Sequence, residues 1–382
     1  MFPRRIDIPL KTRKSFFLFG PRGTGKTTWL RHHLPEALFI NLLRSEHYNR
    51  LTADPGLIRE MIPTGYQDWI IIDEIQRVPE LLNEIHDLIE SGRHIFILTG
   101  SSARKLRQKG VNLLAGRALT YYLHPLTADE QQTAFDLSRS LRHGHLPARF
   151  SEPDPAKYLQ DYVKTYIREE VLQESLTRNI GHFSRFLETA GFSQGAVLNI
   201  SDIAREAHID RAKAENYFSI LEDLLIAVRL PVFSRRAKRK LIRHQKFFYF
   251  DAGVFRAIRP VGPLDSDAEL DGPAMETLVL QELRAVNDYL QCGYHLYFWR
   301  TKSGLEVDFI LYGPQGLIAI EVKRSAHVSP KSLHGLKEFK NDYPPAACYL
   351  FYGGKTPLFK EGITILPISR ALPDLGRVLT KP

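Results

Sequence analysis

The residues whose types and spacing best suit a chemical role lie near the start of the chain, where residues 20–27 read GPRGTGKT. Two glycines bracket four residues and precede Lys-Thr, which is the spacing of a phosphate-binding loop. Glycine lets the backbone turn tightly and direct its N–H groups at phosphate oxygens. Lys26 is expected to reach the β- and γ-phosphates of ATP, and the Thr27 hydroxyl to bind Mg²⁺. The predicted nucleotide-binding residues are Gly20, Pro21, Arg22, Gly23, Thr24, Gly25, Lys26, Thr27 and Thr28.

A second motif, WIIIDE at residues 69–74, supplies the acidic half of such a site. An apolar strand ends in Asp73, which we expect to support the Mg²⁺ ion. Glu74 follows directly and is expected to polarise the attacking water. The two motifs together predict ATP and Mg²⁺ as cofactors.

Two further motifs of the N-terminal part allow more than one interpretation. The stretch HIFILTGSS ends in Thr99, Ser101 and Ser102. Any of these hydroxyls is suited to orient water or sense the γ-phosphate, and a serine there also caps a following helix. Arg117 precedes the next apolar run; it is either an arginine finger that acts on a neighbouring subunit or a surface arginine.

A carboxylate–lysine constellation lies in the C-terminal part. Asp308 falls in the run EVDFI, and Glu321 and Lys323 fall in IAIEVK, with the turn signal GPQG between them. A hairpin would bring Asp308 beside Glu321 and Lys323, which period-two alternation places on one strand face. Glu276, on an expected helix over 273–286, is the fourth member.

This constellation has two interpretations. Asp308, Glu321 and Glu276 are predicted ligands of Mg²⁺, or of Mn²⁺ in its place, for phosphodiester hydrolysis, with Lys323 stabilising charge on the phosphate. In the other interpretation the same residues form a buried ion-pair network without catalysis.

The nucleotide motifs require a parallel α/β sheet to position them. Near-continuous apolar runs predict strands covered by helices on both faces. These strands are expected at 15–19, 38–42, 69–73, 94–99 and 119–123, with a helix over 27–34 after the phosphate loop.

Helical periodicity follows this sheet. Residues 139–157 are rich in Pro, Ser, His and Arg and indicate a linker. Residues 201–207 and 211–221 predict a helix-turn-helix in which Ser201 caps the first helix, with a wing strand within 224–232. The alternative is an interdomain spacer. In a DNA-binding module, Arg211 and Lys213 would approach the duplex.

A basic run at residues 235–240 marks the next boundary, and strands return after it. They are expected at 247–251, 296–300, 306–311, 317–323 and 347–352. Three domains are therefore predicted: a P-loop α/β domain (1–130), a helical region that includes the helix-turn-helix (131–235), and a second α/β domain (236–382).

Composition agrees with several domains and favours a polyanionic partner. The chain has 382 residues, 52 Lys and Arg against 43 Asp and Glu, and a net charge of +9. One hydrophobic core rarely organises so long a chain. The excess positive charge favours nucleic acid, although charge by itself speaks mainly to solubility and non-specific association.

Other classes of protein are disfavoured. The longest apolar runs are too short to cross a bilayer, and residues 1–10 do not read as a signal peptide, so we expect a cytoplasmic protein without a membrane partner. Cys292 and Cys348 have no metal-ligand spacing and are expected to be buried thiols.

The order of motifs resembles a group of prokaryotic AAA-type ATPases with a C-terminal PD-(D/E)XK restriction-endonuclease-like domain. The resemblance rests on GPRGTGKTT, IIIDEIQRVP, LTGSSARKL, LAGR, HPLTADE, GPAMETLVLQEL, WRTKSGLEVDFI and IAIEVK. It implies that residues 1–130 are an AAA-type P-loop ATPase domain, 131–235 a helical lid with a winged-helix-like region, and 236–382 a restriction-endonuclease-like α/β domain. It also implies ATP hydrolysis and a homo-oligomer, with a ring as one form. Val307 stands where the motif name has proline.

The sequence therefore predicts an Mg-ATP-dependent ATPase that acts on DNA, coupling hydrolysis to binding, remodelling of DNA (branched DNA included) or cleavage. The alternative is a nucleotide-switched regulatory ATPase whose nuclease-like domain is catalytically silent and serves interaction.

Overall fold

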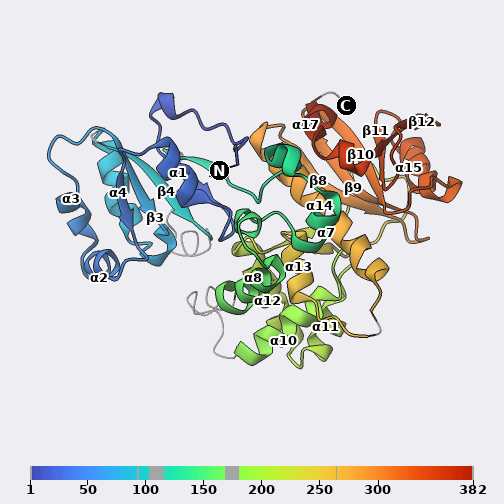
Figure 1. Ribbon diagram of the computed structural model, residues 1–382, viewed down its shortest axis with the longest axis horizontal. Coiled ribbons are helices and arrows are strands. Elements are labelled where there is room, and N and C mark those ends of the chain that lie inside the picture. Colours follow the sequence, from blue (N-terminus) through green and yellow to red (C-terminus); the bar gives the residue numbers. More distant parts are fainter. Residues whose placement is uncertain are drawn as a thin grey trace. The chain divides into compact units, whose positions relative to one another are not determined.

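The computed structural model describes residues 2–92, 94–102, 114, 117–167, 180–263 and 265–380. It divides the chain into two compact units (Figure 1). One unit comprises Ile6–His124 with Asp223–Leu225, and the other comprises Met1–Arg5, Pro125–Glu222 and Ile226–Pro382. The predicted division into three domains stays a prediction.

The first unit is built on a parallel sheet. Its strands are β1 (Phe16–Phe19), β2 (Leu38–Asn41), β3 (Trp69–Asp73), β4 (Ile95–Gly100) and β5 (Leu119–Tyr122), in the spatial order β2-β3-β4-β1-β5. All five predicted strands are present, with ends that differ by at most one residue. The order places β4 between β1 and β3, so the segments after β1 and β3 leave the same edge of the sheet on either side of one strand.

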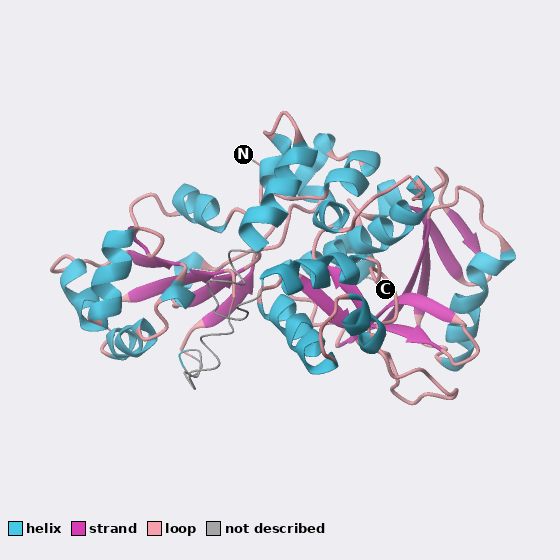
Figure 2. Ribbon diagram, turned by 90° about the horizontal axis from the view of Figure 1, so that it is seen from below, coloured by secondary structure: helices cyan, strands magenta, loops and turns pink. Residues whose placement is uncertain are grey.

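Helices flank these strands (Figure 2). They are α1 (Lys26–His33), α2 (Ser45–Ala53), α3 (Ile58–Met61) and α4 (Leu81–Glu90), with 3₁₀ turns at Leu10–Thr12, Pro55–Leu57 and Ile75–Arg77. The buried face of α4 presents Leu81, Leu82, Ile85 and Leu88 to a core that includes Ile70 and Ile72 of β3. Burial of this helix face and of the central strands stabilises the sheet, and the nucleotide motifs lie where its parallel strands end.

The second unit begins with helices. They are α6 (Ala128–Gln131), α7 (Leu137–His143), α8 (Pro155–Asp161), a π-helical turn Tyr162–Ile167, α10 (Ile180–Gly191), α11 (Ile200–Glu206), α12 (Arg211–Asp223) and α13 (Ala252–Ile258). Strands β6 (Ala227–Leu230) and β7 (Lys246–Tyr249) form an antiparallel pair. The predicted helix-turn-helix and the strand after it therefore correspond to α11, α12 and β6.

Two local predictions in this region are wrong. Asn199, not Ser201, caps α11, because its side chain accepts a hydrogen bond from the backbone N–H of Asp202. Residues 139–157 are not a linker: α7 occupies their start, and His145 and Arg149 are buried. The polar composition misled the prediction because these residues make buried contacts: the His145 backbone N–H donates to Asp251, and the His145 ring lies 3.2 Å from Glu282.

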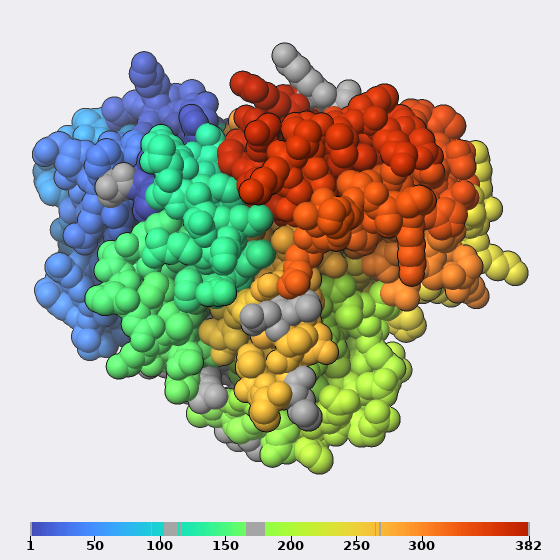
Figure 3. All heavy atoms as spheres, turned by 45° about the vertical axis from the view of Figure 1, so that its right-hand side comes forward, coloured from blue at the N-terminus to red at the C-terminus, as the bar shows by residue number. Residues whose placement is uncertain are grey.

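The rest of the second unit is a mixed sheet with helices. Its strands are β8 (His295–Arg300), β9 (Glu306–Gly313), β10 (Gly316–Lys323), β11 (Ala347–Tyr352), β12 (Leu358–Lys360) and β13 (Ile363–Pro367), in the order β12-β13-β11-β10-β9-β8. The helices are α14 (Asp267–Tyr289), α15 (Pro330–Asp342), α16 (Ile368–Ala371) and α17 (Leu375–Thr380). Figure 3 shows the last of these elements, in orange and red, gathered on one face.

The β9–β10 hairpin is present as predicted, since Gly313 pairs with Gly316 across the turn. One core packs α15 against the sheet through Leu333, Leu336 and Phe339, which meet Trp299 and Val307. The fold class is thus confirmed: a parallel P-loop core, a helical middle region and a mixed C-terminal sheet. Within the described residues, no helix combines the length and apolar character needed to cross a bilayer.

Candidate functional sites

The loop between β1 and α1 has the backbone of a phosphate cradle. Gly23 and Gly25 adopt φ angles of 83° and 93°, a left-handed region that glycine enters at little cost. Gly25 is the N-cap of α1, so the first N–H groups of an eight-residue helix open onto the loop. Gly20 is needed for a different reason, because a Cβ there would lie 2.2 Å from the Leu123 carbonyl oxygen.

The Lys26 side chain is folded over this loop. Its ammonium donates to the carbonyl oxygens of Gly20, at 2.7 Å, and Pro21, at 3.2 Å. Lys26 is 6% exposed. An anion seated on the loop would therefore find the ammonium already at its rim, which fits a nucleotide phosphate.

Thr27 and Asp73 form the oxygen pair expected of a magnesium site. The Thr27 hydroxyl donates to Asp73 at 3.0 Å, and Asp73 also accepts a hydrogen bond from the Thr99 hydroxyl. Asp73 is 3% exposed. Hydroxyl and carboxylate oxygens are the protein ligands that Mg²⁺ accepts beside phosphate oxygens and water. The residues present fit MgATP.

Glu74 is held by a residue that the sequence interpretation missed. The Gln76 amide donates both to the Glu74 carboxylate and, at 3.1 Å, to the Ser101 hydroxyl. Glu74 itself has a φ of 64°, unusual for a residue with a side chain, and its N–H donates to Thr99 at 3.3 Å. Gln76 therefore joins β3 to the end of β4. A glutamine two positions after an Asp-Glu pair was the available signal.

Arg117 lies apart from these contacts. Its guanidinium pairs with Glu90, the last residue of α4, and its side chain is 40% exposed. An exposed arginine remains available to another molecule, so its role in trans stays a prediction.

The β9–β10 hairpin brings Asp308, Glu321 and Lys323 together. The Asp308 N–H donates to the Glu321 carboxylate at 3.3 Å, and the Val322 N–H donates to the Asp308 carboxylate at 2.9 Å. Lys323 pairs with Glu321. The proximity expected from the hairpin is present, while the roles of these residues stay predictions.

A second lysine, absent from the predicted set, lies among these carboxylates. The Lys246 ammonium is 3.2 Å from Asp308 and 3.5 Å from Glu276, and it also pairs with Glu306. Lys246 begins β7 and is 2% exposed. We define the carboxylate cluster as Lys246, Glu276, Glu306, Asp308, Glu321 and Lys323. A lysine at the head of the apolar run KFFYF was the signal that could have revealed Lys246.

Burial is the largest influence on the pKa of the glutamates of the carboxylate cluster. Burial raises the pKa of Glu321 to about 8, the Asp308 carboxylate adds to the rise, and Lys323 opposes it. Burial and Asp308 also raise the pKa of Glu276. Burial acts to lower the pKa of Lys246, but Glu276, Asp308 and Glu306 outweigh it and the net shift is upward. Lys246 is therefore charged near neutral pH, while the carboxyl groups of Glu276 and Glu321 hold protons.

The carboxylate cluster does not fit Mg²⁺ or Mn²⁺ in this arrangement. Among the residues that the structure describes, no group of three or more His, Cys, Asp and Glu side chains is arranged to hold a metal ion. Oxygens of Glu276, Glu306 and Asp308 are instead directed at the Lys246 ammonium.

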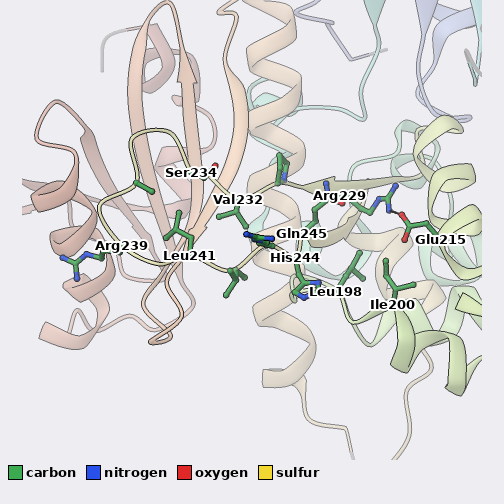
Figure 4. Close-up of a pocket in the computed structure, with 14 residues that line it drawn as sticks. Leu198, Ile200, Glu215, Arg229, Val232, Ser234, Arg239, Leu241, His244 and Gln245 are labelled. Carbon is green, nitrogen blue, oxygen red and sulfur yellow. Dashed lines mark hydrogen bonds and ion pairs between the residues drawn. The ribbon is translucent and has the colours of Figure 1, made fainter. Parts of the chain in front are cut away.

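A groove of about 620 Å³ lies between α11–α12 and the segment 231–245. Figure 4 shows Glu215 and Arg229 toward one end, Arg239 toward the other, and His244 and Gln245 between them. Arg229 is neutralised by Glu215 and Glu222, and Arg239 by Glu338 and Asp342.

Other cations of the segment beside the groove are uncompensated. Arg236, Lys240 and Arg243 are exposed and have no ion-pair partner among the described residues. We call residues 235–243 the basic strap. In Figure 3 the yellow part of the chain, which includes the strap, reaches the surface at the right-hand edge.

Comparison with known families assigns the N-terminal part. Residues 12–132 match the AAA domain family, residues 135–265 match a domain of unknown function (DUF8612), and residues 271–371 match a second domain of unknown function (DUF4143). The chain carries an AAA-type P-loop ATPase domain. None of the three matched families is described as a nuclease.

Two individual proteins are similar to this chain over part of its length. An uncharacterized protein of Haemophilus influenzae is 23% identical over 308 residues, covering 74% of each chain. A shikimate kinase of Aeromonas salmonicida is 31% identical over 150 residues, which are 39% of this chain and 76% of that kinase.

Two solved structures show a weak likeness. The Aeropyrum pernix ORC1 protein in complex with DNA is 14% identical, with 71% of this chain and 88% of that chain covered and a TM-score of 0.24. Protein VC1899 of Vibrio cholerae is 12% identical, with 96% and 97% covered and a TM-score of 0.24. A TM-score this low carries no argument about function.

Proposed function

We propose that this protein is an Mg-ATP-dependent ATPase that acts on DNA, coupling nucleotide hydrolysis to DNA binding or remodelling. The observation that carries the hydrolytic part is the hydrogen bond between Thr27 at the start of α1 and Asp73 at the end of β3. It joins the phosphate cradle to the acidic strand end in the arrangement that phosphoryl transfer to water requires.

Each side chain of this site has a separate task. Lys26 and the α1 N-terminus bind the phosphates, Thr27 and Asp73 hold the magnesium ion, and Glu74 orients the attacking water. The bound ion would neutralise charge that develops on the phosphate oxygens. Gln76 and Ser101 keep the Glu74 carboxylate in one orientation. Arg117 would complete the site of a neighbouring subunit in a homo-oligomer.

The DNA part rests on the distribution of positive charge. Arg236, Lys240 and Arg243 of the basic strap lie beside the groove and lack acidic partners among the described residues. Arg211 and Lys213 are exposed at the first turn of α12. Free cations in two neighbouring segments are suited to successive phosphates of one nucleic-acid backbone.

A second candidate function follows from the carboxylate cluster. The Lys246 ammonium lies among the carboxylates that metal-dependent cleavage would need as ligands, which favours a C-terminal domain that is silent in DNA cleavage and serves interaction. The protein would then be a nucleotide-switched regulatory ATPase. If the protein cleaved DNA in a metal-dependent reaction that required Asp308, Glu321 and Lys323, this second candidate would be wrong.

The test is ATP turnover of the full chain with no DNA, duplex DNA, single-stranded DNA and branched DNA, beside the Glu74→Gln variant. Turnover that DNA stimulates and that the variant loses is expected. Turnover without any DNA response, together with no DNA binding at low salt, would overturn the DNA part and leave the regulatory candidate. No turnover in any condition would overturn both.

A further inference from the structure

We propose that Lys246 is a built-in cation that takes the place of a divalent metal ion in the carboxylate cluster, so that the C-terminal domain binds no catalytic metal. This inference goes beyond the ATPase proposal and does not depend on it, because it concerns only the second compact unit.

The geometry around the ammonium carries the proposal. Lys246 belongs to β7, Glu276 to α14, and Glu306 and Asp308 to β9, so three separate elements converge on one nitrogen. A lysine ammonium has three N–H donors. Three carboxylates lie within ion-pair distance of it, with separations of 3.2 Å to Asp308 and 3.5 Å to Glu276. The ammonium is hydrogen-bonded to Asp308 and Glu306, and the Glu276 carboxylate lies within ion-pair distance without a hydrogen bond to it.

The lysine cannot leave this position without cost. Its backbone is fixed by the pairing with Leu230 and by a bridge to Val197. The ammonium also lies 5.6 Å from the centre of the Phe298 ring. On rotating away, the buried ammonium would lose its favourable charge contacts with these carboxylates, and a metal ion arriving beside it would meet like charge.

Removal of the charge should open the position. In Lys246→Met the carboxylates of Glu276, Glu306 and Asp308 would face one another without a cation. Without the ammonium, small rotations of these side chains would bring their oxygens around one point, which is the ligand set that a hard divalent ion prefers. The variant is therefore expected to gain metal binding that the parent protein lacks.

The experiment measures Mn²⁺ binding by the loss of the free-ion EPR signal, with no nucleotide present. All proteins carry Asp73→Asn, so that the nucleotide site contributes little. The background protein should bind no stoichiometric Mn²⁺. Addition of Lys246→Met should create one site with a Kd of about 1 mM or lower. Further addition of Asp308→Asn should abolish this site.

Two results would overturn the proposal. One is stoichiometric Mn²⁺ binding by the background protein that Asp308→Asn removes, because the lysine would then not exclude the metal. The other is a folded Lys246→Met variant that binds none. If that variant does not fold, Lys246→Gln replaces it, and the measurement on the background protein still decides whether the native cluster takes a metal. Loss of ATP turnover would leave all these readings unchanged.

Discussion

The Thr27 hydroxyl donates a hydrogen bond to the Asp73 carboxylate across 3.0 Å, although 46 positions separate the two residues in the chain. Thr27 follows the phosphate loop and Asp73 ends β3, so the contact forms only because β1, β4 and β3 are neighbours in the parallel sheet. The pair joins phosphate binding to metal binding at one edge of the sheet.

Substitutions of Lys26 and Glu74 should affect different steps: ATP binding for Lys26 and ATP hydrolysis for Glu74. Lys26→Ala removes a cation needed to hold the phosphates and should weaken ATP binding. Glu74→Gln keeps the size of the side chain but removes the charge that polarises water, so nucleotide affinity should persist while turnover falls by about 10²-fold or more. Equilibrium binding of a fluorescent ATP analogue and steady-state turnover measure the two effects. Equal loss of binding in both variants would contradict these roles.

Gln76 is expected to act as a positioning residue. Gln76→Ala frees the Glu74 carboxylate from its amide donor, so kcat should fall by roughly tenfold while KM for ATP changes little. Gln67→Ala, an exposed glutamine of the same unit, is the matched control. A rise in KM with unchanged kcat would show that Gln76 serves binding and not orientation of Glu74.

Gly20 should resist substitution more than a glycine in open space. A Cβ at Gly20 would lie 2.2 Å from the Leu123 carbonyl oxygen, whereas a Cβ at Gly65 meets nothing within 4 Å. Gly65→Ala should lower the free energy of unfolding by about 1 kcal/mol, because alanine is strained in the left-handed φ region. Gly20→Ala should lower the free energy of unfolding further, because backbone must move. Urea unfolding of both variants checks the order, and equal costs would contradict the close approach.

The carboxylate cluster should make stability depend on pH. Burial raises the pKa of Glu321 from 4.5 to about 8, so the folded state holds a proton there that the unfolded state has released. This contribution is present at low pH and is lost as pH rises from about 5 to 8, by up to about 1.4 kcal/mol per pH unit.

The measurement is the difference in unfolding free energy between parent and Glu321→Gln across that range. The free energy of unfolding of the parent, relative to that of Glu321→Gln, should decrease as pH rises. Glu152→Gln, at an exposed position of the same unit, should show no such trend. A pH-independent difference for Glu321→Gln would mean that the carboxyl group is ionised throughout.

The basic strap should determine the salt dependence of DNA binding. Lys240→Gln and Arg243→Gln each remove one cation that would neutralise a phosphate, so each should reduce the slope of log K against log salt by about 0.9 on duplex DNA. Lys331→Gln and Lys355→Gln, which are exposed elsewhere in the unit, serve as controls. Equal effects of all four substitutions would indicate non-specific attraction by net charge.

The sequence by itself determined the first sheet and the nucleotide motifs. Apolar runs such as WIIID are long enough and regular enough to set strand positions, and the glycine spacing of the phosphate loop follows from local backbone requirements. The β9–β10 hairpin was likewise local, since its turn signal and alternating pattern lie within one short stretch.

Only the tertiary structure decided which distant residues share a site. Gln76 reaches Ser101 through the pairing of β3 with β4, and Lys246 reaches Asp308 through the packing of β7 on β9, contacts that no local pattern encodes. The same holds for His145 and Arg149, whose polar types indicate a linker although their side chains are buried beside Glu282 and Gln131. Periodicity reports which face of an element is buried, whereas the identity of the buried charge partner depends on contacts between elements far apart in the chain.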